Sequence, residues 1–287
     1  MKHKGKALGS KSWLYYFGKM IINLLIYIIA ISYIFPFFWM LYTSFKSRAE
    51  YTMSMFALPK EWTFHNYINA FMPEIGFFRA FYNSVFNTLI SVIFIILLSF
   101  MVGYLLSRYK FKGQNLLFSF FMVSIFIPSH ALLVPVYIQF RALGMLGTKF
   151  VLLFPYITLA LPIAIFLYSK YIETIPRSID EAAHMDGAGM FSIIYRIMFP
   201  VCMPMTGTLI ILNVMGVWNE FSFALVLASM EKARTLPLWL TVFDSQYSSN
   251  ITLKVTGIMV CCLPVILVYM FFSDKIMEGI ATGAIKG

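Results

Sequence analysis

Long apolar runs occupy most of the chain, and short polar segments separate them. Six runs are long enough to cross the roughly 30 Å hydrocarbon core of a bilayer as helices of about 20 residues. They cover residues 20–42, 81–106, 116–138, 150–168, 201–227 and 255–272. We interpret the prolines inside them as bends, because neighbouring helices satisfy the freed backbone groups. The pattern predicts an all-α polytopic membrane protein with six transmembrane helices.

The composition agrees with this prediction. Apolar residues make up 60% of the chain and charged residues 12%, whereas about a quarter of the residues of a soluble domain are charged. Membrane lipid is therefore an expected partner that covers much of the surface. The three cysteines lie in predicted spans without CxxC spacing, which favours buried thiols over a metal site or a disulfide.

The basic residues predict the orientation of the chain. Residues 1–19 carry five lysines and no acidic residue, and the positive-inside rule places such a segment in the cytoplasm. We therefore expect a cytoplasmic basic N-terminus (1–19), a six-helix transmembrane domain (20–272) and a cytoplasmic C-terminal tail (273–287). No small-residue cleavage site follows the first run, which favours an uncleaved span over a signal peptide. The scattered charges fit helix flanks and anionic lipid, so no nucleic-acid partner is expected.

The sequence contains no catalytic signature. It lacks the GxxxxGK[ST], HExxH, GxSxG and GxGxxG patterns, and its four histidines are far apart. We expect no enzyme activity, no metal and no bound cofactor in this chain. If this protein uses ATP and Mg, partner subunits bind them.

One polar segment interrupts the apolar pattern between the fourth and fifth runs. In "PRSIDEAAHMDGAG", Ser178 is followed three residues later by Glu181, which is the spacing of a capping box. Gly187 is placed to end the helix with a left-handed turn. Residues 171–200 are therefore predicted to form a helix-turn-helix on the cytoplasmic face, and an ordinary amphipathic connector on the membrane is the alternative. The second part carries apolar residues at helical spacing: Phe191, Ile194 and Met198.

This segment resembles the cytoplasmic EAA loop of binding-protein-dependent ABC importer permeases. The family pattern is EAA, three residues, Gly, and then about nine residues before an apolar residue and Leu-Pro; Phe199 stands where the family often has Leu. Three further stretches are similar to the sugar-importing branch and to the second permease subunit of the maltose transporter. They are "LPKEWTFHNYINAF", "GVWNEFSFAL" and "KIMEGIATGAIKG". The resemblance covers nearly the whole chain.

The resemblance implies an ATP-driven importer in a bacterial or archaeal plasma membrane. This chain would be a permease that moves a sugar or oligosaccharide into the cell. Its partners would be a second homologous permease subunit, two cytoplasmic ATP-binding subunits and an extracytoplasmic sugar-binding protein. Glu181 would pair with a basic group of the ATPase, the alanines would permit close packing, and Gly187 would allow the bend. The implied ATPase-coupling residues are Glu181, Ala182, Ala183, Asp186, Gly187 and Pro200.

The fifth run contains the candidate substrate path. An ionisable residue inside a span is costly and is by default a functional candidate. An aromatic ring suits the apolar face of a sugar, and amide and carboxylate groups accept hydrogen bonds from its hydroxyls. The alternative is that Glu220 bonds a neighbouring helix and Trp218 anchors at the interface. The candidates are Asn213, Trp218, Asn219 and Glu220.

Two further expectations concern the outer loop and the other function classes. The loop over residues 228–254 is long and carries apolar residues around Trp239 that need cover. Relatives direct this loop toward the binding protein, so we expect the same contact through residues 243–250. A secondary transporter would show inverted repeats and charged pairs at mid-membrane, which this sequence lacks. That class and an importer permease for a non-sugar solute remain the alternatives.

Overall fold

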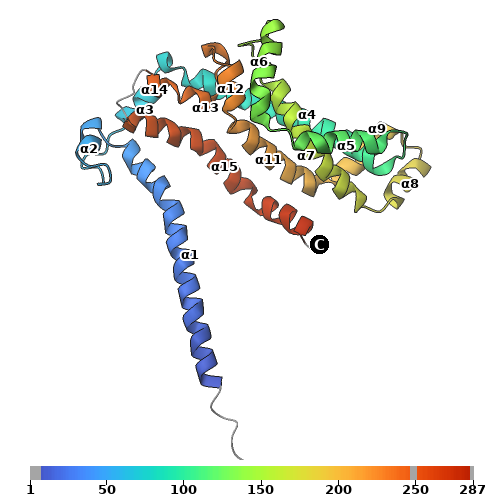
Figure 1. The fold of residues 1–287 in the computed structure, drawn as a ribbon, viewed down its shortest axis with the longest axis horizontal. Coiled ribbons are helices and arrows are strands. Elements are labelled where there is room, and N and C mark those ends of the chain that lie inside the picture. Colours follow the sequence, from blue (N-terminus) through green and yellow to red (C-terminus); the bar gives the residue numbers. More distant parts are fainter. Residues whose placement is uncertain (1–7, 246–250, 285–287) are drawn as a thin grey trace, which may run out of the picture. The chain divides into compact units, whose positions relative to one another are not determined.

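The computed structural model describes residues 8–245 and 251–284, and within these ranges every secondary-structure element is a helix (Figure 1). It divides into two compact units. One comprises residues 1–70 and 248–259, and the other comprises residues 71–247 and 260–287. The long helix α15 (Ile251–Ala284) begins in the first unit and continues in the second. The all-α prediction is confirmed.

The first unit is built on α1 (Leu8–Ser44), which is followed by α2 (Arg48–Met53) and α3 (His65–Ala70). Residues Tyr15–Ser44 are long and apolar enough to span a membrane, and none of their most apolar stretch is buried within the chain. A helix that exposes apolar side chains all round belongs in lipid or against another protein. Pro36 lies inside α1, which continues through it.

Polar groups fix the end of α1. The last carbonyls of a helix have no partner within it, and the Ser44 carbonyl accepts bonds from Asn66 Nδ2 at 2.9 Å and Thr256 Oγ1 at 3.2 Å. Lys46 is only 1% exposed, and its Nζ donates to the Ser54 carbonyl at 3.0 Å. Side chains therefore satisfy the backbone where α1 turns into the segment that follows it.

The centre of the second unit is the pair of helices α4 (Phe77–Arg108) and α7 (Leu153–Glu173), which share the most extensive helix contact in the described chain. Gly103 lies where the two backbones meet. A Cβ at this position would be 2.9 Å from Tyr168 Cβ and 3.2 Å from the Ile165 carbonyl oxygen. Small residues at such interfaces let membrane helices approach closely, so Gly103 sets the spacing of the pair.

Broken helices pack around this pair. The first consists of α5 (Gln114–Ile125), η2 (Ser129–Leu132) and α6 (Leu133–Ala142). The second consists of α11 (Met203–Trp218) and α12 (Ser222–Leu227). The remaining elements are short: η1 (Pro73–Ile75), α8 (Ser178–Met185), α9 (Met190–Ser192), the π-helix η3 (Ile193–Met198), α10 (Phe199–Val201), η4 (Glu231–Ala233), α13 (Leu236–Trp239) and α14 (Val242–Ser245).

Two apolar cores stabilise the second unit. One joins α4 and α7 to the π-helix and is centred on buried Phe100, Tyr168 and Ile194. The other joins the start of α7 to α12 and α13 and is centred on buried Leu152 and Phe223. Burial of large apolar side chains contributes about 1.5–3 kcal/mol each. The two cores hold the two ends of α7 in place.

The predicted spans match the helices unevenly. Three helices of the described chain are long and apolar enough to cross a membrane alone: those at residues 15–44, 77–108 and 153–173. The third predicted run is a helix pair bent by 94°. A second pair, bent by 81°, joins residues 190–201 to α11, where the fifth run begins, and counting each pair as one span gives up to five. The sixth run lies in α15, whose described apolar part is Ile251–Leu267. Six spans stay a prediction.

Two prolines do more than bend their helices. Pro36, Pro162 and Pro264 lie inside continuous helices, as the sequence predicts. However, α5 ends before Pro128, and Pro204 lies in the first turn of a new helix. The interpretation of these two as bends within one helix is wrong. The residue before a proline is biased away from helical geometry, so a helix often ends there.

Candidate functional site

Residues 178–201 form the predicted helix-turn-helix. Helix α8 ends in a Schellman motif, in which Ala188 N donates to the Ala183 carbonyl and Gly187 N donates to the His184 carbonyl, both at 3.0 Å. Gly187 has a φ of +79°, which lies in the left-handed region that favours glycine. The predicted role of Gly187 in the turn is confirmed.

The start of α8 differs from the prediction. Ser178 is the first helical residue, and the cap is Arg177, whose side chain makes no capping bond. The predicted capping box between Ser178 and Glu181 is therefore wrong. Arg177 already has helical backbone angles, so the Ser178 hydroxyl is one position too late to cap the helix.

A different acid of the same helix is buried. Asp180 Oδ2 lies 2.9 Å from Arg108 Nε, and its Oδ1 accepts a 2.8 Å hydrogen bond from the Tyr104 hydroxyl. None of these three residues was predicted as a site residue from the sequence. One feature of the sequence could have indicated that Asp180 is buried: it directly follows the apolar Ile179 on an amphipathic helix.

The predicted coupling residues divide between the two faces of this segment. Ala183 is buried against the core, whereas the other five are exposed: Glu181, Ala182, Asp186, Gly187 and Pro200. In the second part Ile194 and Met198 are buried but Phe191 is exposed. The π-helix explains this, because its wider turn shifts the face presented by the residues after Ser192.

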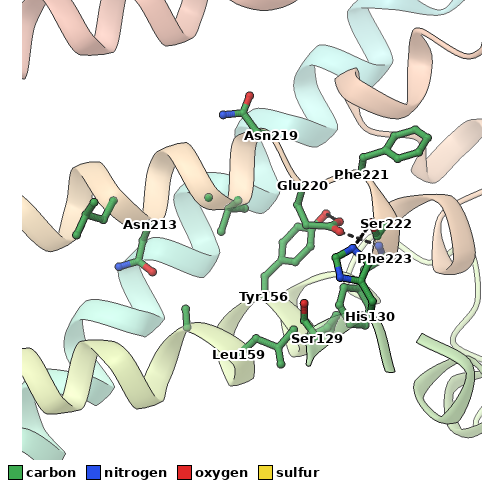
Figure 2. A pocket seen from close by; sticks show the side chains of 15 residues that line it. Ser129, His130, Tyr156, Leu159, Asn213, Asn219, Glu220, Phe221, Ser222 and Phe223 are labelled. Carbon is green, nitrogen blue, oxygen red and sulfur yellow. Dashed lines mark hydrogen bonds between the residues drawn. The ribbon is translucent and has the colours of Figure 1, made fainter. Parts of the chain in front are cut away.

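A cavity of about 510 Å³ lies at the break between α11 and α12; its surface is mostly apolar but includes several polar side chains, and we call it the polar cavity. Figure 2 shows Glu220, Tyr156, His130 and Ser222 close together at one end, with Asn213 toward the other. The His130 Nε2 and Ser222 Oγ atoms are 3.3 Å apart. The lining comes from η2, α7, α11 and α12: Ser129, His130, Pro155, Tyr156, Leu159, Ala160, Leu212, Asn213, Gly216, Val217, Asn219, Glu220, Phe221, Ser222 and Phe223.

Glu220 holds the break between α11 and α12 together. Its Oε1 accepts from Phe223 N at 2.7 Å, and its Oε2 accepts from Ala224 N at 3.2 Å and from the Tyr156 hydroxyl at 2.9 Å. A carboxylate at a helix N-terminus also interacts favourably with the helix dipole. The charge therefore caps α12 and ties it to α7.

The other predicted path residues lie in two places. Asn213 and Asn219 line the polar cavity, and each donates from Nδ2 to the carbonyl four residues earlier, Leu209 at 2.7 Å and Met215 at 2.9 Å. Trp218 lies in a separate apolar cavity of about 210 Å³ and packs edge-on against Phe81. Sequence reasoning missed Ser129, His130, Tyr156 and Ser222, because they come from other elements.

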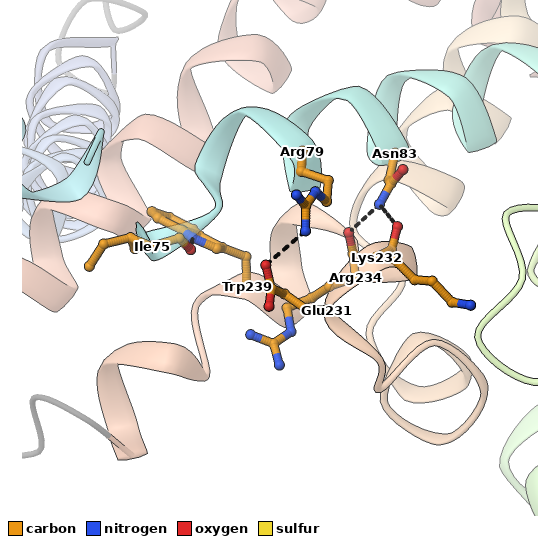
Figure 3. Close-up of polar contacts among 7 residues, drawn as sticks. All are labelled: Ile75, Arg79, Asn83, Glu231, Lys232, Arg234 and Trp239. Atoms are coloured by element: carbon orange, nitrogen blue, oxygen red, sulfur yellow. Dashed lines mark hydrogen bonds and ion pairs between the residues drawn. The ribbon is translucent and has the colours of Figure 1, made fainter. Parts of the chain in front are cut away.

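The segment after α12 folds back on the start of α4 (Figure 3). Asn83 Nδ2 donates to the carbonyls of Lys232 and Arg234, both at 3.0 Å, and the Trp239 indole donates to the Ile75 carbonyl at 2.7 Å. Trp239 and its apolar neighbours are buried, so the expected cover exists. The expected binding-protein contact covers residues 243–250, of which 246–250 lie outside the described residues.

Within the described ranges no three His, Cys, Asp or Glu residues come together to hold a metal ion. Comparison with known proteins then gives the family. The model of the "Binding-protein-dependent transport system inner membrane component" family matches residues 95–281, which is more than half of the chain. The chain belongs to this family. It is a multi-pass permease component of the cell membrane and not an enzyme itself, and it works with a binding protein and an ATPase.

Relatives and a solved structure extend the match over almost the whole length. The chain is 37% identical over 253 residues to the ABC transporter permease protein ORF2 of Caldicellulosiruptor sp. (strain Rt8B.4), covering 88% of this chain and 91% of that one. It is 30% identical to the melibiose/raffinose/stachyose import permease MelC of Bacillus subtilis (strain 168), covering 93% and 96%. One chain of a bacterial ABC transporter that imports the acidic polysaccharide alginate has the same fold, with a TM-score of 0.81, 22% identity and coverage of 95% of this chain and 99% of that chain.

Proposed function

We propose that this chain is a permease subunit of an ABC importer for sugars or oligosaccharides, of the type of the second permease subunit of the maltose transporter. The polar cavity at the break of α11 and α12 carries this proposal. It offers amide, hydroxyl, imidazole and carboxylate groups within an otherwise apolar helix bundle, which is the chemistry that binds a neutral polyhydroxylated solute. MelC, the similar permease that imports melibiose, raffinose and stachyose, supports the same class.

The proposed topology has six spans, with both termini in the cytoplasm. Residues 1–19, 20–272 and 273–287 then form the basic N-terminus, the transmembrane domain and the C-terminal tail. The pair α5 and α6, the pair α11 and α12, and α15 complete the spans that the three continuous helices begin. The partners are a second permease, two ATP-binding subunits that bind ATP and Mg, and an extracytoplasmic sugar-binding protein.

The proposed path for the sugar runs through the polar cavity. Asn213, Asn219, Ser129 and His130 are the groups that meet its hydroxyls, while Glu220 keeps the cavity in shape. The lining includes a carboxylate and no lysine or arginine, so an uncharged sugar fits better than an acidic one. We assign Trp218 to the packing of α11 against α4.

The proposed contact with an ATP-binding subunit lies on the exposed side of α8. The exposed residues there are Glu181, Ala182, Asp186 and Gly187. Ala183 packs against the core, and Pro200 lies in α10, just before α11. Glu181 meets a basic group of the ATPase. Closure of the ATPase then moves this segment as a lever.

The turn at Gly187 provides the test. Gly187→Val places a β-branched residue at a φ of +79°, which costs about 1–3 kcal/mol. We expect this variant to assemble but to hydrolyse ATP without moving sugar. Gly189→Ala is the matched control, because Gly189 has a φ of −72° and nothing lies within 4 Å of a Cβ there.

The measurement is uptake of labelled melibiose, raffinose or maltotriose into vesicles that hold the complete importer, with ATP hydrolysis followed in the same sample. ATP-dependent accumulation by the parental importer and by Gly189→Ala supports the proposal. Accumulation driven by an ion gradient without ATP would indicate a secondary transporter. ATP-dependent import of a non-sugar solute alone would contradict the sugar assignment.

A further inference from the structure

One carboxylate fixes the inner face of α8 to the end of a long helix. Asp180 is buried, and both of its oxygens are held by α4, one by Arg108 Nε at 2.9 Å and the other by the Tyr104 hydroxyl at 2.8 Å. Tyr104 and Arg108 are four residues apart, so they lie on one face of the last turns of α4. The first turn of α8 is therefore attached to a single site on α4.

The Arg108 guanidinium also contacts the chain before α8. Its Nη2 donates to the Ile175 carbonyl at 3.0 Å. A planar guanidinium presents several donors in fixed directions, whereas an ammonium is a compact charge on a flexible stem. Arg108 therefore holds both the approach to α8 and its first turn, which a lysine would not reproduce.

The ion pair is almost completely removed from solvent. The side chains of Arg108 and Asp180 are 6% and 11% exposed. Apolar residues of similar shape often stabilise a protein as well as a buried ion pair does, yet removal of one partner leaves a buried charge uncompensated. The apolar contacts of Ala183 and Ile179 already attach α8 to the core. The charges add a fixed orientation to that attachment.

The opposite face of α8 is exposed. Glu181, Ala182 and Met185 lie there, and Met185 is 88% exposed. The helix is thus held rigidly on one side and presents its other side to a partner.

We infer that Arg108 and Asp180, with Tyr104, are positioning residues that make α8 and α4 move as one body. A force on the exposed face of α8 then reaches a helix that crosses the membrane. This inference rests on the proposed contact of α8 with an ATP-binding subunit. None of the three residues lines the polar cavity, so they act on transport only through helix position.

Three variants of the complete importer test the inference. Asp180→Asn keeps the shape but removes the charge, Arg108→Lys keeps the charge but not the two-sided contact, and the exchange R108D with D180R reverses the pair. The control is Glu173→Gln, which removes one charge from the exposed pair of Lys170 and Glu173 at the end of α7, with N–O distance 3.0 Å. It changes charge in the same region without touching α8.

The first measurement is hydrogen exchange of residues 175–190. Loss of one partner of a buried pair is strongly destabilising locally, so exchange in Asp180→Asn should be at least about tenfold faster. Arg108→Lys should lie between Asp180→Asn and the parental protein, the exchanged pair should regain part of the protection, and Glu173→Gln should match the parental protein. Parental exchange in Asp180→Asn would overturn the inference.

The second measurement is the number of ATP molecules hydrolysed per sugar imported, with whichever of labelled melibiose, raffinose or maltotriose the parental importer accumulates. We expect this ratio to rise about tenfold in Asp180→Asn and to fall again in the exchanged pair. A merely structural pair would lower the amount of assembled importer and leave the ratio unchanged, which would overturn the inference. If the parental importer accumulates none of these sugars, the sugar assignment fails, and the exchange data alone decide whether α8 is fixed to α4.

Discussion

Glu220 illustrates how a single carboxylate is accommodated at a break between two apolar helices. An ionised group in a transmembrane segment is costly and needs partners. Both carboxylate oxygens of Glu220 accept hydrogen bonds, from the Tyr156 hydroxyl and from two backbone N–H groups in the first turn of α12. This arrangement matches the alternative drawn from the sequence, in which Glu220 bonds a neighbouring helix, and it also shapes the cavity.

Glu220→Gln should impair sugar uptake while assembly stays normal. The glutamine side chain keeps one oxygen as an acceptor, but its NH2 group faces N–H or O–H groups that are themselves donors. Each buried donor left without an acceptor costs about 1–3 kcal/mol. A cost of roughly 1.4 kcal/mol corresponds to a tenfold change, so the initial rate of uptake should fall about tenfold. Tyr156→Phe removes only one of the bonds and should have a smaller effect.

The control for this pair is Thr158→Val, which removes an exposed hydroxyl from the same turn of α7 without reaching the cavity. It should transport at the parental rate. Uptake by Glu220→Gln at that same rate would show that the bonds to α12 and α7 do not matter for transport.

Helix spacing is set at one point of the α4 and α7 pair. A methyl group at Gly103 would meet Tyr168 Cβ and, at 3.1 Å, the backbone nitrogen of Ser169. Neither is the flexible end of a side chain, so the helices must separate. Forcing extra volume into a packed interface costs about 1–3 kcal/mol.

Gly103→Ala should therefore lower the melting temperature of the purified chain in detergent, measured by the loss of helical circular dichroism. Gly207→Ala is the matched control, because no atom lies within 4 Å of a Cβ there. Alanine is the better helix former by about 1 kcal/mol, so this variant should be neutral or slightly stabilising. A lower melting temperature for both variants would argue against close packing as the cause.

Elements were predictable where one apolar run makes one helix. The runs at 81–106 and 150–168 became α4 and α7, since uniform apolar composition over that length leaves little alternative in a membrane. At Pro128 and Pro204 the composition is the same but the direction changes sharply. Hydropathy measures transfer to lipid and contains no information on direction, so it did not predict the break between α5 and α6.

Sites were less predictable than elements, because they join distant residues. The cost of an intramembrane acid identified Glu220, but nothing in the sequence links it to Tyr156. Tyr104 and Asp180 are 76 positions apart, and only tertiary packing brings them together. Gly187 was predictable, since a left-handed turn depends on local backbone chemistry.

At the scale of the whole molecule, Asn83 helps to attach the segment after α12 to the start of α4. Asn83→Ala removes two hydrogen bonds, each worth about 0.5–1.5 kcal/mol net, and should loosen residues 229–236. If this segment docks the loaded binding protein, its affinity for the importer should fall about tenfold, while basal ATP hydrolysis stays unchanged. Binding of labelled binding protein to the reconstituted importer is the measurement.

Arg79→Gln is the comparison for this prediction. Arg79 and Glu231 are 57% and 67% exposed, with an N–O distance of 2.8 Å, and an exposed pair contributes at most about 1 kcal/mol. It should change docking much less than Asn83→Ala does. Equal losses in the two variants would show that surface charge, and not the fold of the segment, governs docking.

The exposure of α1 has a consequence for biosynthesis. The most apolar stretch of α1 has a mean hydropathy of 2.3, and none of it is buried within the chain. The corresponding stretch of α7 has a mean hydropathy of 1.5, and 39% of it is buried. A helix as apolar as α1 enters the bilayer from the translocon without help from another helix. The less apolar α7 gains more from α4, which precedes it in the chain and emerges earlier from the ribosome. The order of synthesis thus delivers an autonomous helix first and a dependent helix only after its partner is in the membrane.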